Sequence, residues 1–115
     1  MESLISKEIE NTKGLNLSVY NEFDWDSLII LSPYTSLDLV EKQFYLDLSN
    51  VSNSIEMLDS INLIIFLQNN KAVKYVELSR NIADFDSNHE IIDKKNAQFI
   101  LEVEKGAKIL KISRL

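Results

Sequence analysis

The sequence of 115 residues has no cysteine, one histidine and two glycines. Because there is no cysteine, neither a disulfide bond nor a thiolate metal site is available. Gly14 and Gly106 are too few to build a phosphate-binding glycine loop or a Gly-x-Ser-x-Gly nucleophile elbow. A histidine-based catalytic dyad would have to use His89, whose polar neighbours Asn88 and Glu90 favour a surface loop.

Long apolar runs are also missing. Leu28–Leu31 is typical of a buried strand, whereas a membrane helix needs roughly 20 consecutive apolar residues. Met1-Glu2-Ser3 has neither the basic nor the apolar region of a signal peptide. We therefore expect no transmembrane segment. The expected localisation is cytoplasmic, or the bacterial periplasm or cell envelope if a leader was removed.

Acidic residues outnumber basic ones. The net charge is −6 and the sequence pI is about 4.7, which argues against nucleic acid as a partner because nucleic acid requires a basic face. Residues 20–60 contain eight acids and one lysine, whereas residues 94–115 contain six basic residues and two acids. Either these two blocks meet across the fold, or the acidic block steers a basic protein partner.

The apolar spacing predicts two short helices. One covers residues 2–13 and is stopped by Gly14. The other follows Thr35 or Ser36, either of which can cap it, and carries Asp38 in its first turn.

Strands are predicted from apolar runs and turn residues. Leu28–Leu31 is apolar on both faces, as in a central strand, and Pro33 ends it. Two hairpins are expected, with Asn69-Asn70-Lys71 and Lys105-Gly106 at their turns. The expected strands are Leu15–Tyr20, Leu28–Leu31, Ile61–Leu67, Ala72–Leu78, Gln98–Glu104 and Ala107–Ser113. We predict one α+β domain over residues 1–115, with a mainly antiparallel sheet of about five strands. Its N-terminal helix and second short helix are expected to pack on one face.

The segment before the central strand holds the only tryptophan. Glu22, Asp24 and Asp26 alternate with Phe23 and Trp25, so an extended chain would point the acids one way and the rings the other. We interpret the acids as a solvated ridge. The ring of Trp25 is expected to pack at the rim of the core, with a partner for its N–H.

A second acidic stretch imitates the start of a calcium loop. Asp84, Asp86 and Asn88 offer oxygen donors at alternate positions. His89 stands where the loop needs glycine, and Lys95 stands where it needs a bidentate glutamate. We therefore expect turn capping here, and neither a bound metal nor a cofactor.

Residues 23–35, FDWDSLIILSPYT, resemble an F-x-W-D-x-(apolar run)-x-P-Y-T signature of small bacterial proteins, many of them predicted lipoproteins. The similarity covers about residues 20–86, including Arg80 and Asp84-Phe85, and extends weakly to the last hairpin. It implies a mature domain anchored in the cell envelope, although the lipid-bearing cysteine of such proteins has no counterpart here. That group has no established activity to carry over.

The sequence favours a non-catalytic protein-binding domain, as an immunity-type inhibitor that neutralises a cognate bacterial toxin by occluding it. Small size, acidity and the lack of a catalytic motif fit, because blocking a basic active site needs only a complementary surface. The residues expected to bind the partner are Glu22, Asp24, Asp38 and Glu41.

Two alternatives remain open. The first is an envelope-associated structural or assembly domain. The second is a hydrolase that uses acids alone, with Glu22, Asp24 or Asp26 opposite Asp84 or Asp86.

Overall fold

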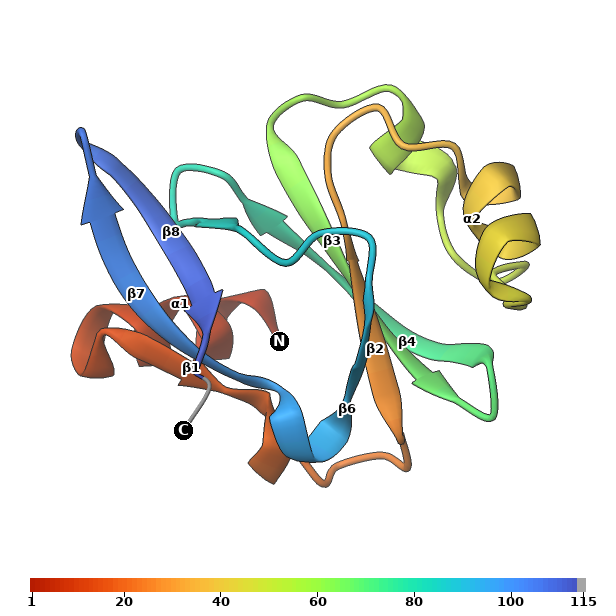
Figure 1. The fold of residues 1–115 in the computed structure, drawn as a ribbon, viewed down its shortest axis with the longest axis horizontal. Helices are drawn as coiled ribbons and strands as arrows, with labels where there is room; N and C mark the ends of the chain where they lie inside the picture. Colours follow the sequence, from red (N-terminus) through yellow and green to blue (C-terminus); the bar gives the residue numbers. More distant parts are fainter. Residues whose placement is uncertain (114–115) are drawn as a thin grey trace.

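The computed structural model describes residues 1–113, which form two β-sheets of four strands and two α-helices (Figure 1). One sheet is built on the C-terminal hairpin. Its strand order is β1 (Gly14–Asn16), β7 (Gln98–Glu104), β8 (Ala107–Ile112) and β5 (Asp84–Phe85). The first three pair antiparallel, and β5 pairs parallel to β8. Lys105 and Gly106 both have positive φ, which confirms the turn predicted between β7 and β8.

The second sheet is entirely antiparallel. Its order is β4 (Lys71–Ser79), β3 (Ile61–Gln68), β2 (Ser27–Leu31) and β6 (Ile91–Asp93). Every residue of β2 is buried, which confirms the predicted central strand. Asn69 and Asn70 have φ of 52° and 66°, the left-handed conformation that a tight hairpin requires and that asparagine tolerates.

The two helices cover opposite faces of the β2–β3 layer. Ile5 of α1 (Glu2–Thr12) packs in the cluster that contains Leu28 and lies between the two sheets. Val40 of α2 (Leu37–Phe44) packs in the cluster that contains Ile29. Figure 1 shows α2 on the side of this layer that faces away from β7 and β8. Within residues 1–113, no helix is long and apolar enough to cross a membrane.

The α+β class, the N-terminal helix and the Ser36 cap of α2 are confirmed: the Ser36 hydroxyl accepts the Leu39 N–H at 3.3 Å. The arrangement differs from the prediction in two respects. The strands form two sheets where one was expected, and the helices lie on opposite faces. The reason is that the C-terminal hairpin pairs with β1 instead of joining β2, β3 and β4. The short strands β5 and β6, two and three residues long, were not predicted and add one edge strand to each sheet.

The N-terminal boundaries also differ. Helix α1 ends at Thr12, Lys13 takes the left-handed position with φ of 58°, and Gly14 already belongs to β1. A Cβ at Gly14 would lie 2.9 Å from the backbone oxygen of Phe99, so close strand packing requires this glycine. The strand expected over Leu15–Tyr20 is shorter and runs into a 3₁₀ turn. The described 3₁₀ turns are Leu17–Val19, Asn53–Glu56 and Lys94–Asn96.

Candidate functional site

The segment before β2 places the ring of Trp25 in the core and packs the half-buried Phe23 against it. Trp25 is 4% exposed, and its Nε1–H donates to the backbone oxygen of Tyr20 at 2.8 Å. The Phe66 ring meets Trp25 and Phe23 edge-on, with centroids 4.9 Å and 5.2 Å away. The ammonium of Lys94 lies 5.0 Å from the centroid of the Trp25 ring. The predicted burial of Trp25, with a partner for its N–H, is confirmed.

Asp26 fastens the start of β2 to the neighbouring hairpin. Its carboxylate accepts the backbone N–H of Asn69 and the hydroxyl of Ser27, each at 2.9 Å. Its own N–H donates to the oxygen of Leu67 at 2.8 Å. Asp26 therefore serves the fold, although it is exposed like Glu22 and Asp24, as predicted for the acidic ridge.

The four acids expected to bind a partner lie on two separate parts of the molecule. Glu22 and Asp24 precede β2, whereas Asp38 and Glu41 lie on α2, beyond the other end of that strand. The carboxylate of Asp38 is 3.0 Å from the ammonium of Lys42, and its side chain is 69% exposed. Glu41 is half-buried, and its Oε2 accepts the N–H of Leu48 at 2.8 Å. Asp38 is thus the solvent-facing member of the α2 pair.

The acidic and basic blocks do not neutralise each other among the described residues. The ion pairs within residues 1–113 are local, namely Lys42–Asp38, Arg80–Asp84 and Lys111 with Glu102 and Glu104. Lys94 reaches back to the acidic block, but its ammonium contacts the Trp25 ring and the side-chain oxygen of Asn21. Arg114 of the basic block lies outside the described residues.

Exposed apolar side chains surround α2 next to Asp38. Tyr34 and Leu39 are each 65% exposed, and Tyr45 is 85% exposed. Together with Asp38, these residues form what we call the α2 surface. Tyr34 lies in the turn before α2 and Tyr45 ends the helix, while Val40 on the opposite side of the helix is buried. The sequence pointed to Asp38 but not to these three apolar neighbours.

Both tyrosines of the α2 surface have left-handed backbones. Their φ angles are 63° for Tyr34 and 57° for Tyr45. An L-residue with a side chain loses about 1–2 kcal/mol in this region, and glycine is the usual residue after a helix. The fold holds both positions through backbone hydrogen bonds: the Tyr34 N–H donates to Ile55, and the Tyr45 N–H donates to Glu41.

His89 lies against the turn that carries Tyr34. Its Nε2 is 3.1 Å from the hydroxyl oxygens of Ser32 and Thr35, and the Ser32 N–H donates to it at 3.3 Å. A serine–histidine pair becomes catalytic when a substrate cleft and oxyanion donors adjoin it. A groove of about 380 Å³ near this segment of the chain is lined by other residues, mainly of β6 and the end of β8. We therefore interpret His89 as a side chain that ties the segment before β6 to the turn after β2.

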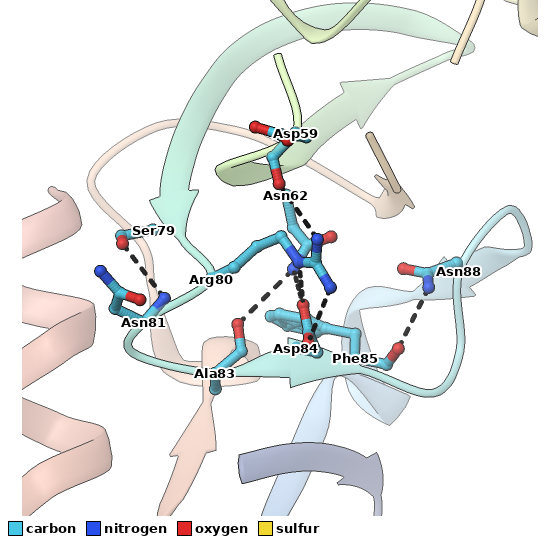
Figure 2. Close-up of polar contacts among 9 residues, drawn as sticks. All are labelled: Asp59, Asn62, Ser79, Arg80, Asn81, Ala83, Asp84, Phe85 and Asn88. Atoms are coloured by element: carbon cyan, nitrogen blue, oxygen red, sulfur yellow. Dashed lines mark hydrogen bonds and ion pairs between the residues drawn. The ribbon is translucent and has the colours of Figure 1, made fainter. Parts of the chain in front are cut away.

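A polar cluster joins the two sheets (Figure 2). Asn62 of β3 is 2% exposed, and its amide donates to Asp84 of β5 at 2.9 Å. Arg80 donates through Nε to the same carboxylate at 2.8 Å and through a terminal nitrogen to the backbone oxygen of Asp59 at 3.0 Å. Partial burial raises the pKa of Asp84, but the hydrogen bonds from Arg80 and Asn62 lower this pKa by more than burial raises it. The pKa of Asp84 is therefore below its ordinary value. These contacts explain the cluster as a structural link.

One pairing considered for an acid-only hydrolase, Asp26 with Asp84, places its two carboxylates far apart. Asp26 is bonded to Asn69, just beyond the end of β3, whereas Asp84 is bonded to Asn62 near its start. At about 3.3 Å per residue, these two ends of β3 are roughly 20 Å apart. In the part of the chain that the structure describes, no group of three or more histidine, aspartate or glutamate side chains gathers as a metal site would require.

Comparison of the chain with family models, with curated proteins and with solved structures found no match.

Proposed function

We propose that this protein is a non-catalytic binding domain that occludes a basic partner protein through its α2 surface, as an immunity-type inhibitor does with a cognate bacterial toxin. The observation that carries the proposal is the combination of exposed apolar side chains and acidic charge around α2. Exposed apolar groups in contact with polar ones characterise the surfaces at which proteins bind each other.

Charge supports a basic partner. Residues 32–59, which include α2, contain five acids and one lysine. That lysine, Lys42, is paired with Asp38. From outside the stretch, Arg80 contacts the backbone oxygen of Asp59 and Lys71 lies beside Asp47, which still leaves more acids than bases in this part of the molecule. An acidic surface of this kind attracts a basic protein over about one Debye length, near 10 Å at 0.1 M salt, and so speeds their encounter.

Occlusion is favoured over catalysis because the described contacts use three of the candidate reactive groups for structure. Asp26 and Asp84 each accept hydrogen bonds that hold strands together, and His89 holds a turn. A binding surface needs none of these groups to be free. Inhibition by surface complementarity therefore requires only the side chains that remain exposed around α2.

The test joins capture with a growth assay. The immobilised protein is incubated with extract of its native host, and a stoichiometric partner is identified and expressed alone in a bacterial host. We expect the partner to arrest growth, and co-expression of this chain to restore it. An Asp38→Lys variant should restore growth less well, whereas Glu10→Lys on α1 should act like the wild type. A harmless partner drawn from envelope assembly machinery would contradict inhibition and support the envelope-associated role.

A further inference from the structure

We infer that Tyr34 and Tyr45 are the anchors of the α2 surface, and that each inserts its ring between basic side chains of the partner protein. This inference rests on the proposed function, since it names the side chains that give the same surface its affinity. Acidic charge accelerates encounter, but dissociation is governed by buried anchor residues. Tyrosine is among the residues most enriched at such positions.

The exposure of these two rings sets them apart from the other tyrosines. Tyr20 is half-buried, and its hydroxyl donates to Glu8 at 3.1 Å. Tyr75 is 36% exposed on β4. Tyr34 and Tyr45, at 65% and 85% exposed, leave most of their apolar area in water at the two ends of one helix. Leu39, on the same helix, is as exposed as Tyr34.

The backbone at these positions would be served better by smaller residues. Where the β3–β4 hairpin needs left-handed residues, the chain uses Asn69 and Asn70, which tolerate that conformation. At the turn before α2 and at its end, the chain instead carries tyrosine at φ of 63° and 57°. Lys13, His89 and Lys105 also occupy left-handed positions, so it is the exposed rings of the two tyrosines, and not their backbone alone, that point to an interface.

The partner's chemistry follows from what surrounds the rings. Asp38 lies between them along the chain, and the stretch from 32 to 59 is acidic. Arginine and lysine bind the faces of tyrosine rings through cation–π contacts and pair with carboxylates. The α2 surface therefore fits a protein surface on which arginine or lysine side chains flank an apolar patch.

The experiment uses a phage-displayed library of random peptides as the probe. Peptides selected on the immobilised protein are titrated into isotopically labelled protein and followed by NMR. We expect enrichment of arginine or lysine together with apolar residues, and shifts of the backbone amides of Tyr34, Leu39 and Tyr45. A library that yields only peptides bound elsewhere, such as in the groove beside β6, would overturn the inference.

Variants at two helix-ending positions with the same left-handed backbone distinguish loss of a binding side chain from relief of backbone strain. Tyr45→Gly should raise the melting temperature by about 4 °C, because glycine relieves the left-handed strain, and should weaken peptide binding by at least about 10-fold. Lys13→Gly is the matched control: Lys13 ends α1 with φ of 58°, so it should gain stability without changing binding. Tyr34→Asn should weaken binding as Tyr45→Gly does. Binding that stays within twofold of wild type in both tyrosine variants would overturn the inference.

The same data distinguish failure of the anchors from failure of the proposed function. If Asp38→Lys weakens the binding of basic peptides but Tyr45→Gly does not, the anchoring role of the tyrosines is contradicted and the acidic recognition surface is supported. Peptides without arginine or lysine that still require both tyrosines would support the anchors and contradict a basic partner.

Discussion

Replacement of Trp25 by alanine should destabilise the protein by about 3–5 kcal/mol, the usual cost of truncating a large buried aromatic residue. The ring is 4% exposed and packs edge-on against Phe66. Loss of the Nε1–H also removes the hydrogen bond to the backbone oxygen of Tyr20, and the loss of one such bond typically lowers the free energy of unfolding by about 1 kcal/mol. Trp25→Phe should therefore lose less, about 1–2 kcal/mol, because it keeps most of the packing and removes the hydrogen bond.

Urea unfolding followed by far-UV circular dichroism measures both variants. Intrinsic tryptophan fluorescence is unsuitable because Trp25 is the only tryptophan. The slope m should stay constant while the midpoint falls. Leu39→Ala is the control, since a side chain that is 65% exposed should change stability by no more than about 0.5 kcal/mol. A loss below about 1 kcal/mol for Trp25→Ala would refute the packing argument and make Trp25 a contact residue.

Three further results are expected. The pKa of Asp84 is lowered in the folded protein, so its contribution to stability is complete above its unfolded pKa near 4 and is lost as pH falls through the folded value. The free energy of unfolding should therefore fall less steeply with decreasing pH in Asp84→Asn than in wild type, and equal slopes would contradict this. Burial and the neighbouring Glu8 carboxylate raise the pKa of Tyr20 to about 12, so ultraviolet titration should show one tyrosine ionising near pH 12, and earlier in Glu8→Gln. Calcium or zinc should leave the melting temperature unchanged, since a shift of several degrees would reveal a bound ion.

The elements that the sequence predicted well carry strong local signals. β2 and β3 have uninterrupted apolar runs, and Asn69-Asn70 and Lys105-Gly106 are typical hairpin residues. β5 and β6 carry no such signal, because they are short and form only where β8 and β2 offer a free edge. The division into two sheets depends on the pairing of β1 with β7, which are more than 80 residues apart in the sequence, and local patterns do not reveal such a pairing.

The candidate site was predictable only in its charges. Acids can be counted along a sequence, and Asp38 was singled out that way. Tyr34 and Tyr45 are exposed at left-handed positions, which sequence patterns associate with glycine or asparagine. Contacts across many residues were equally hidden: His89 meets Ser32 from 57 positions away, and nothing in either local sequence indicates it.

The most direct test of recognition through the α2 surface is the association rate of the captured partner with Asp38→Lys at two salt concentrations. We predict association several-fold slower than wild type at 0.1 M salt, with the difference shrinking at 1 M, where the Debye length falls to about 3 Å. Glu10→Lys makes the same change in net charge away from α2 and should leave the rate near wild type. Equal rates for wild type and Asp38→Lys at both salt concentrations would contradict recognition through this surface.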